Sequence, residues 1–352
     1  MTIMAGGTGG HVFPALAVAQ EMRARGWDVR WMGTPDSFES RTVPGHGFPL
    51  DTIPAYRLRG QGLSSLLLAP FRLLGAMRKA GKILRSTRPQ LVLGMGGFVT
   101  GPGGLVSRLL GIPLVIHEQN TIPGMTNRWL AKIAAQVLQA FPHSFPDKLG
   151  AVVTGNPVRE EIAAVAPPEL RMVGRDEARR VLIVGGSLGA LALNQQLPPV
   201  LAQLRLPLRI RHQAGRGKAE EAGKLYPAEM QAEVTAFIDD MAEALAWADL
   251  VICRAGALTV SELAAVGVAS VLVPFPHAVD DHQTRNAAYL VDAGAAVLMP
   301  QSEMRPETLE QQLQALLEDR EKLLSMAKAA RKLARLDATR TVADYCEAQA
   351  MS

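Results

Sequence analysis

Two glycine-rich loops have the composition of phosphate-binding turns. Residues 6–11 (GGTGGH) stand between a short apolar run and a helix-length segment, and residues 185–190 (GGSLGA) occupy the same place in the second half of the chain. Glycine allows a positive φ and a close approach of backbone N–H groups to a ligand, and a helix N-terminus favours an anion. The alternative interpretation of each loop is a tight turn that serves only packing.

A third loop is more specific because polar residues follow its glycine at helical spacing. Residues 254–262 (RAGALTVSE) follow an apolar run and open a helix. A diphosphate could accept hydrogen bonds from the N–H groups of Leu258 and Thr259, and Glu262 could accept two from a ribose diol. The same residues also fit a capping box, in which Thr259 is only the N-cap and Glu262 its partner.

Two common nucleotide-binding motifs are absent. The G-x-G-x-x-G/A pattern, started at Gly7, meets Val12 at its last position, and Leu188 stands where the second loop would need its middle glycine. The second expected strand ends in Trp31-Met32-Gly33 without an acidic residue, and Gly-Lys-Ser/Thr occurs nowhere. An NAD enzyme and a P-loop ATPase are therefore not expected.

The elements that must position these loops follow from the apolar pattern. Short β-branched runs alternate with amphipathic stretches, which predicts parallel strands joined by right-handed helical crossovers. Strands are expected at 3–5, 29–32, 50–53, 91–94, 114–117, 137–140 and 152–154, and then at 181–184, 208–212, 234–237, 250–253, 270–273 and 296–299. Residues 163–175, with two adjacent prolines, are typical of a linker.

The length of 352 residues favours two domains over one. A strand, a glycine loop and a helix recur in that order near the start of each half. We therefore expect an α/β fold with two Rossmann-like parallel sheets facing each other across a cleft. The expected domains are residues 1–158 and 159–335, with a last helix at about 336–352 packed back on the first domain. One large doubly wound sheet is the alternative.

Charge is distributed unevenly along the chain. The net charge of +4 combines +9 in residues 1–157 (16 basic, 7 acidic) with −5 in residues 158–352 (21 basic, 26 acidic). No acidic residue lies between Asp51 and Glu118, which predicts an anionic partner for the first half. The two cysteines, the broken apolar runs and the lack of an apolar leader predict a cytoplasmic protein without a spanning helix.

Eight motifs in one order carry a family resemblance. They are GGTGGHVFPALA at 6–17, GMGGFVTGPGG at 94–104, HEQN at 117–120, GNPVR at 155–159, GGSLGA at 185–190, FIDDM at 237–241, CRAGALTVSEL at 253–263 and HQTRNA at 282–287. The series resembles the MurG family of bacterial peptidoglycan glycosyltransferases, within glycosyltransferase family 28, over essentially the whole chain. Phe98, where the family often has Tyr, and His282, where it often has Gln, depart from the family pattern.

The resemblance implies a GT-B fold and a defined reaction. N-acetylglucosamine would pass from UDP-GlcNAc to the C4 hydroxyl of undecaprenyl-diphospho-MurNAc-pentapeptide (lipid I), giving lipid II. The acceptor diphosphate is expected at Thr8, Gly9 and Gly10. The backbone of Ile238 would bind uracil, and Glu262 the ribose. The full set of implied donor residues is Asn120, Arg159, Ser187, Ile238, Ala257, Leu258, Thr259, Val260, Ser261, Glu262 and Gln283.

The chemistry of such a transfer agrees with these roles. The chain has no Asp-x-Asp motif, so helix N-termini and an arginine are expected to stabilise the leaving diphosphate without a metal or other cofactor. A base must remove the acceptor proton. His11 is the first candidate because it follows a glycine loop and histidine titrates near neutrality, and Glu118 is the second. Alternatively, His11 caps the helix or orients the acceptor phosphate.

Residues 63–88 combine leucines with cations. Leu73, Leu74, Met77 and Leu84 would share one side of a helix that Pro70 is expected to open, and the sector beside them is basic. This pattern is typical of a helix on an anionic membrane surface, although an ordinary surface helix is the alternative. The lipid-linked acceptor favours the membrane, at the cytoplasmic face of the inner membrane. Nucleic acid is not expected, because no recognition motif occurs.

Other functions fit parts of these observations. Another GT-B UDP-sugar transferase, a UDP-GlcNAc epimerase and a non-catalytic nucleotide-sugar-binding membrane adaptor would each share the architecture. The resemblance also leaves room for protein partners in cell-wall synthesis.

Overall fold

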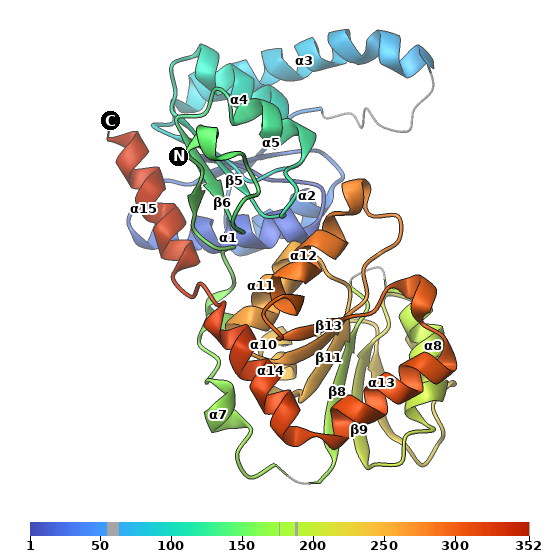
Figure 1. Cartoon of the computed structure of the whole chain (residues 1–352). Coiled ribbons are helices and arrows are strands. Elements are labelled where there is room, and N and C mark those ends of the chain that lie inside the picture. Colours follow the sequence, from blue (N-terminus) through green and yellow to red (C-terminus); the bar gives the residue numbers. More distant parts are fainter. Residues whose placement is uncertain (55–62, 176, 187–188, 352) are drawn as a thin grey trace. The chain divides into compact units, whose positions relative to one another are not determined.

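The chain folds into two compact units (Figure 1). A computed structural model describes residues 1–54, 63–175, 177–186 and 189–351. Unit 1 comprises Met1–Arg159 and Arg335–Ser352, and unit 2 comprises Glu160–Ala334.

A parallel sheet forms the centre of unit 1. In the described residues it has seven strands, in the order β3-β2-β1-β4-β5-β6-β7. The strands are β1 Thr2–Met4, β2 Arg30–Gly33, β3 Leu50–Thr52, β4 Val92–Gly94, β5 Leu114–Glu118, β6 Gln136–Gln139 and β7 Val152–Val153. Because β2 and β3 lie on one side of β1 and β4 on the other, the strand order reverses between β1 and β4. Ligands of open α/β sheets bind at such a switch point, outside the carboxyl ends of the strands.

Unit 2 repeats this plan with a second parallel sheet. Its described strands follow the order β10-β9-β8-β11-β12-β13, so the switch point lies between β8 and β11. The strands are β8 Arg179–Val184, β9 Leu208–Gln213, β10 Gln231–Thr235, β11 Leu250–Cys253, β12 Ala269–Leu272 and β13 Ala296–Leu298. All thirteen expected strands overlap an observed strand. The predicted pair of Rossmann-like parallel sheets is confirmed.

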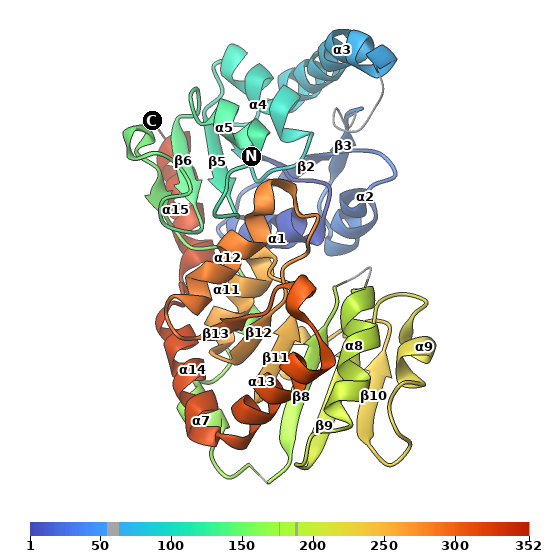
Figure 2. The same cartoon turned by 45° about the vertical axis from the view of Figure 1, so that its right-hand side comes forward.

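Helices cover both faces of the first sheet. One buried apolar cluster joins the sheet to α1 and α15, and another joins it to α3, α4 and α5. The helices of unit 1 are α1 Gly9–Ala24, α2 Phe38–Thr42, α3 Leu63–Thr87, α4 Thr100–Leu109, α5 Met125–Leu130 and α15 Ala338–Ala350, with short 3-10 turns η1 Val43–His46 and η2 Asp147–Leu149. The turned view in Figure 2 shows α3 and α4 together on one side of this unit.

The last helix belongs to the first unit. Helix α15 packs along α1 (Figure 1). Arg25 donates hydrogen bonds to Asp344 and Glu347 at 2.7 and 2.8 Å, and Trp27 Nε1 donates to Glu347 at 2.9 Å. Buried Val342 and Cys346 complete the contact. The C-terminal segment therefore closes one face of the sheet that begins at the N-terminus.

The core of unit 2 is one large apolar cluster. It joins the sheet to α8, α13 and α14. The helices are α6 Glu160–Ala163, α7 Pro168–Arg171, α8 Leu191–Leu201, α9 Ala219–Gly223, α10 Met241–Trp247, α11 Ala257–Val266, α12 His282–Val291, α13 Pro306–Glu318 and α14 Arg320–Lys332, with 3-10 turns η3 Val279–Asp281 and η4 Gln301–Glu303.

The linker interpretation of residues 163–175 is wrong, because this segment is anchored in unit 2. Arg171 Nη2 donates to the carbonyl of Gly267 at 2.6 Å, and the buried Arg175 pairs with Asp249. Pro167 and Pro168 begin α7, where proline is favoured because a first-turn N–H needs no partner. The two prolines thus indicate the start of a helix.

Helix α3 also differs from expectation. Pro70 lies inside it and does not open it, since the helix already begins at Leu63. No helix in the described part of the chain is long and apolar enough to cross a membrane.

Candidate active site

The predicted site residues gather at the carboxyl edges of the two sheets. In unit 1, the carboxyl ends of β1, β4 and β5 and the loops that follow them carry the first glycine loop, residues 94–97 and the HEQN motif. In unit 2, the loops after β8 and β11 carry the second and third loops. Both sets therefore flank the switch point of their own sheet.

The first glycine loop rests on a buried carboxylate. Gly7 has φ +98° and donates its N–H to Glu39 Oε2 at 3.1 Å, and Thr34 donates to Oε1 at 3.0 Å from its N–H and 2.7 Å from its hydroxyl. A Cβ on Gly6 would lie 2.5 Å from Glu39 Oε1. Burial opposes ionisation of Glu39, but these hydrogen bonds hold its pKa below the ordinary value. The ionised Glu39 side chain thus supports the conformation of the glycine loop.

The N-terminus of α1 begins without a side-chain cap. Thr8 is the N-cap, and its side chain makes no capping hydrogen bond. The N–H groups of Gly9 and Gly10 precede the first helical hydrogen bonds, so no acceptor within the helix can reach them. Thr8, Gly9 and Gly10 therefore form one open edge, as a phosphate contact requires.

His11 lies in the first turn of α1 with its half-buried ring turned toward β5. Its Nδ1 lies 2.7 Å from Oε1 of Gln119. A Cβ on Gly96 would lie 2.7 Å from this Nδ1, so only glycine leaves room for the ring. The capping interpretation of His11 is wrong, because Thr8 is the N-cap and the ring bonds to Gln119.

Glu118 organises the loop that follows β5. Its side chain is buried, and Oε1 accepts from Asn120 N at 2.9 Å and Asn120 Nδ2 at 3.2 Å. Oε2 accepts from Gly124 N at 3.1 Å and Asn127 Nδ2 at 2.9 Å. Four donors thus hold both oxygens in place. The side-chain NH₂ of Asn120 is thus one of the donors to this carboxylate.

Arg159 ends the chain segment of unit 1 that contains GNPVR. Its guanidinium lies over the Phe13 ring at 5.5 Å, which connects it to helix α1. Asn156, three residues earlier, is buried, and no hydrogen-bond partner for either side-chain polar atom occurs in the described part of the chain. The motif therefore places both a cation and an uncompensated amide in this segment.

In unit 2 the second glycine loop is held against the end of β9. Gly185 N donates to the Gln213 carbonyl at 3.2 Å, and a Cβ on Gly189 would lie 2.0 Å from the Ala214 carbonyl oxygen. Asn194, on α8, donates to that same carbonyl at 2.9 Å. Ser187, which was expected to bind the diphosphate, lies outside the described residues.

Helix α11 presents the third loop without a side-chain cap. Its N-cap is Gly256, so the capping-box interpretation of Thr259 is wrong. Val260 makes the first helical hydrogen bond, to Gly256 at 2.9 Å, which leaves the N–H groups of Ala257, Leu258 and Thr259 beyond any acceptor in the helix. The first turn contains no acidic residue. This helix start is therefore well suited to an anion.

The remaining residues of α11 have different environments. Val260 is fully buried, and the Ser261 hydroxyl donates to the Ala257 carbonyl of its own helix at 2.9 Å. Glu262 is buried in the second turn. Only Glu262 among these three therefore combines a charge with a position one turn beyond the open N–H groups.

Gln283 and Ile238 lie on different elements of unit 2. Gln283, in α12, accepts from Phe275 N through Oε1 at 2.8 Å, which turns its NH₂ group away from that loop. Ile238 follows β10, at the edge of the sheet, and lines a cavity of about 330 Å³ with Thr235, Phe237 and others.

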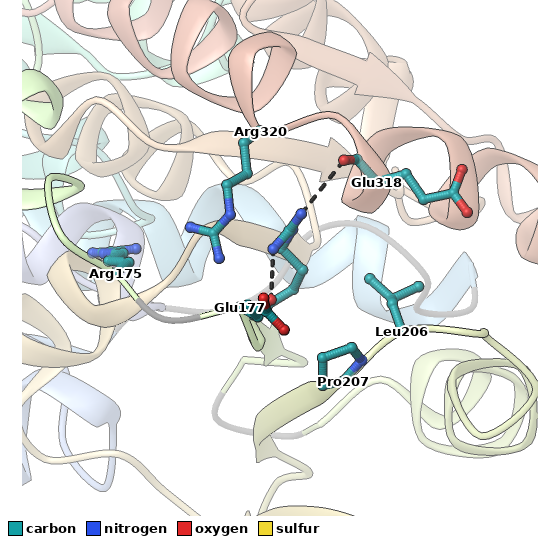
Figure 3. Close-up of a pocket in the computed structure, with 7 residues that line it drawn as sticks. Arg175, Glu177, Leu206, Pro207, Glu318 and Arg320 are labelled. Carbon is teal, nitrogen blue, oxygen red and sulfur yellow. Dashed lines mark hydrogen bonds between the residues drawn. The ribbon is translucent and has the colours of Figure 1, made fainter.

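A larger cavity, of about 400 Å³, lies at the amino ends of β8 and β9 in this sheet. Figure 3 shows its lining by Arg175, Glu177 and Arg320, beside Leu206 and Pro207. These residues precede β8 and β9 or begin α14, so they flank the amino ends of the strands. The volume of this cavity therefore does not mark the expected donor site.

Sequence reasoning missed three residues of the first site. Glu39 lies 32 residues from Gly7, to which it is hydrogen-bonded, and no local motif predicts this contact. His117 and Gln119 stand inside HEQN, yet only Glu118 and Asn120 were singled out there. The signal that could have found them is the alternation of side chains along a strand. In a strand that leads toward the carboxyl edge of the sheet, His117 and Gln119 share one face and Glu118 lies on the other.

Comparison with known proteins places both units in one family. Residues 1–139 match the glycosyltransferase family 28 N-terminal domain, and residues 180–342 match the glycosyltransferase family 28 C-terminal domain. The crystal structure of Acinetobacter baumannii MurG aligns with a TM-score of 0.87 and 44% identity, covering 99% of each chain.

Curated relatives align over nearly the whole chain. A protein of Marinobacter nauticus is 56% identical over 98% of this chain and 96% of its own length. One of Aeromonas hydrophila is 52% identical over 99% and 96%. Both are named UDP-N-acetylglucosamine–N-acetylmuramyl-(pentapeptide) pyrophosphoryl-undecaprenol N-acetylglucosamine transferase. These matches show that the chain is a GT-B glycosyltransferase and belongs to glycosyltransferase family 28.

Proposed function

We propose that this protein transfers N-acetylglucosamine from UDP-GlcNAc to the C4 hydroxyl of undecaprenyl-diphospho-MurNAc-pentapeptide (lipid I), forming lipid II for peptidoglycan. The observation that carries the proposal is the alignment of 98–99% of the chain with relatives named for this transfer. The reaction inverts the anomeric carbon, because the acceptor oxygen displaces the diphosphate directly.

Unit 2 supplies the donor site in this proposal. The uncharged first turn of α11 offers N–H groups at Leu258 and Thr259 to the diphosphate, where negative charge grows as UDP leaves. Glu262, buried one turn further, accepts hydrogen bonds from the ribose hydroxyls. The backbone of Ile238 binds uracil, and the NH₂ group of Gln283 binds a hydroxyl of GlcNAc, with Ala257 beside it.

Unit 1 supplies the acceptor site. The N-terminus of α1, at Thr8, Gly9 and Gly10, binds the lipid diphosphate. Gly7 is excluded from this contact, because its N–H already donates to Glu39. Arg159 and Asn120 of this unit are expected to add contacts to the donor, and Glu118 holds Asn120 in its loop.

His11 is the base in this mechanism. Glu118 accepts four hydrogen bonds and is buried, so a proton transfer to it would break the loop around it. His11 stands at the end of the phosphate-binding edge, with one ring nitrogen committed to Gln119. The acceptor's C4 hydroxyl therefore loses its proton to the histidine while its oxygen bonds to the anomeric carbon.

Release of UDP tests the reaction directly. We expect release from UDP-GlcNAc only when a lipid I analogue is added, and little release from UDP-galactose. Turnover of UDP-GlcNAc without lipid would instead identify an epimerase. Binding of UDP-GlcNAc with no release on addition of lipid would identify an adaptor, and equal release from both donors a transferase of another specificity.

The proposed location is the cytoplasmic face of the inner membrane, through an anionic lipid surface. Phe71, Leu73 and Leu74 of α3 are exposed, whereas Leu84 is buried against the unit, so these two parts of the helix have different roles. The neighbouring helices α4 and α5 expose Leu109, and Met125 with Trp129. Basic residues without acidic neighbours border these apolar groups, as in helices that lie on anionic bilayers.

Vesicle binding tests this surface. Phe71→Ser with Leu74→Ser should weaken binding to anionic vesicles about tenfold or more, since each buried apolar side chain contributes roughly 1.5–3 kcal/mol. The matched control is Leu170→Ser with Val173→Ser, which removes two exposed apolar side chains from unit 2. Equal loss in both double variants, or binding to neutral vesicles of the same strength, would count against the proposed surface.

A further inference from the structure

A hydrogen-bond relay runs through the carboxyl edge of the first sheet. It consists of the Gly155 carbonyl, His117, Gln119 and His11. His117 Nε2 lies 3.0 Å from the Gly155 oxygen, Gln119 Nε2 lies 3.2 Å from His117 Nδ1, and Gln119 Oε1 lies 2.7 Å from His11 Nδ1. His117 and Gln119 are almost completely buried, so water does not substitute for these partners.

The carbonyl at one end of the relay fixes the direction of every donor. The Gly155 oxygen only accepts, so the proton of His117 is on Nε2. Burial lowers the pKa of His117 to about 4, which keeps its ring neutral and leaves Nδ1 as an acceptor. The group facing Nδ1 must then be the NH₂ of Gln119.

A second contact sets the Gln119 amide independently. The same NH₂ group lies 3.2 Å from the His117 carbonyl, which also only accepts. The amide oxygen of Gln119 therefore faces His11 and accepts a hydrogen bond from Nδ1–H. In neutral His11 the proton is on Nδ1, and Nε2 carries a lone pair. Within the described residues this Nε2 makes no hydrogen bond.

We infer that Gln119 and His117 are positioning residues that hold His11 in the Nδ1–H tautomer, so that Nε2 accepts the proton of the acceptor hydroxyl. The inference rests on the proposed function and specifies which atom acts. As the C4 oxygen bonds to the anomeric carbon, the bond from that carbon to the diphosphate breaks and UDP leaves with its electron pair. The C4 proton moves to Nε2, and the resulting imidazolium keeps its Nδ1–H on Gln119 before it releases the new proton to water.

The backbone around the relay enforces the same geometry. Gly96 has φ +101°, and a Cβ there would lie 2.7 Å from Nδ1 and 2.8 Å from Cε1 of His11. Gly6 N donates to the Gly96 carbonyl at 3.3 Å, so the glycine loop and the loop after β4 are joined beside the ring. The ring is thereby confined to the side on which Gln119 lies.

The tautomer of His11 can be measured without substrate. The full chain, with ¹⁵N- and ¹³C-labelled histidine, is studied by NMR at a pH at which the ring is neutral, and the His11 signals are assigned from His11→Ala. We expect the proton on Nδ1, although neutral histidine in water favours Nε2–H. A proton on Nε2 in the unaltered protein overturns the inference, whatever the activity of any variant.

Gln119→Leu removes the acceptor and has a matched control. We expect His11 to change to the Nε2–H tautomer and kcat to fall about 10- to 100-fold, toward the loss of general-base catalysis, with unchanged affinity for UDP-GlcNAc. Gln139→Leu removes another buried glutamine, which bonds to Phe145 N and the Ala151 carbonyl at the end of β6 and not to the relay. It should preserve the tautomer and kcat.

The outcomes separate this inference from the proposed function. An unchanged tautomer in Gln119→Leu, or an equal loss of kcat in Gln139→Leu, contradicts the positioning role. If His11→Ala keeps its turnover while the tautomer responds as expected, the assignment of His11 as base fails and the relay stands. Absence of acceptor-dependent UDP release in the unaltered protein would overturn the reaction itself.

Discussion

The two units present the same strand, loop and helix at their switch points, but different side chains lie behind the loops. In unit 1, buried His117 connects through Gln119 to the ring of His11, and a carboxylate, Glu39, lies under the glycine loop. In unit 2, buried His212 lies between Tyr226 and Asn194, at 3.0 and 3.1 Å, and Asn194 ends on the carbonyl of Ala214. The first network connects the Gly155 carbonyl to the half-buried ring of His11, whereas the second connects the Tyr226 hydroxyl to the Ala214 carbonyl and includes no histidine other than the buried His212.

This difference shows what topology does and does not determine. The shared order of strands places helix N-termini at both edges, and either edge can bind a diphosphate. Proton transfer additionally needs a titratable group with a fixed tautomer, which depends on buried side chains. We therefore assign acid–base chemistry to unit 1 and binding of the leaving group to unit 2.

The largest expected effect separates these assignments. His11→Ala should lower kcat about 100- to 10,000-fold, the range of general-base catalysis, and leave the Kd for UDP-GlcNAc unchanged. The measurements are UDP release with a lipid I analogue and calorimetric binding of the donor. His46→Ala, at an exposed histidine of the same unit, is the control. Near-normal turnover of His11→Ala would contradict the assignment of proton transfer to unit 1.

His212, the buried histidine of unit 2, should affect the free energy of unfolding and not the rate of catalysis. Burial lowers the pKa of His212 to about 4, below its ordinary 6.5. Unfolding then binds a proton between these values, so this stability is present above pH 6.5 and is lost as pH falls toward 4. Over that interval His212 contributes roughly 3 kcal/mol to the loss.

Urea unfolding at a series of pH values measures this contribution. His212→Gln should flatten the acid branch of the stability curve, while His143→Asn, at an exposed histidine, should leave it unchanged. If both variants keep the pH dependence of the free energy of unfolding of the unaltered protein, His212 does not stay neutral in the folded state. The contrast between His212 and the relay of unit 1 would then fail.

Much of this architecture could be predicted from sequence, because local pattern determines it. The strand at Leu250–Cys253 and the first three residues of the strand at Leu114–Glu118 are apolar runs, as in fully buried parallel strands, and both strands were found where expected. Pro70 and Pro168 were misjudged, because proline marks a turn, a helix start or a tolerated helix interior depending on its surroundings.

The candidate site was predictable only in part. Backbone N–H groups at helix starts follow from loop and strand pattern, so Leu258 and Thr259 could be named in advance. The roles of Gln119 and Glu39 depend on contacts across 108 and 32 residues, and on which atom of an amide faces which ring nitrogen. Such directions follow only from the folded network, because each donor is assigned from its neighbour.

The donor side is tested by Glu262. Glu262→Ala should weaken binding of UDP-GlcNAc about tenfold, since hydrogen bonds to a charged group contribute roughly 1.5–3 kcal/mol each and water replaces part of that loss. Calorimetry measures the Kd, and kcat at saturating donor should change less. The control, Glu307→Ala, alters an exposed first-turn glutamate of α13. An unchanged Kd would place the ribose elsewhere in unit 2.

The smallest effect concerns the charge that lies under the first loop and has no counterpart among the contacts described for the second. Glu39→Gln keeps one acceptor but loses the charge, so the free energy of unfolding should fall about 1 kcal/mol at pH 7. Because hydrogen bonds hold the folded pKa below its ordinary value, this stabilisation is present above that ordinary value and disappears as pH falls through the folded pKa. The free energies of unfolding of Glu39→Gln and of the unaltered protein should therefore converge in acid.

Asp36→Asn, at an exposed carboxylate of the neighbouring loop, should show no such convergence. A constant difference between Glu39→Gln and the unaltered protein at every pH would mean that shape, and not charge, supports the loop that ends in His11.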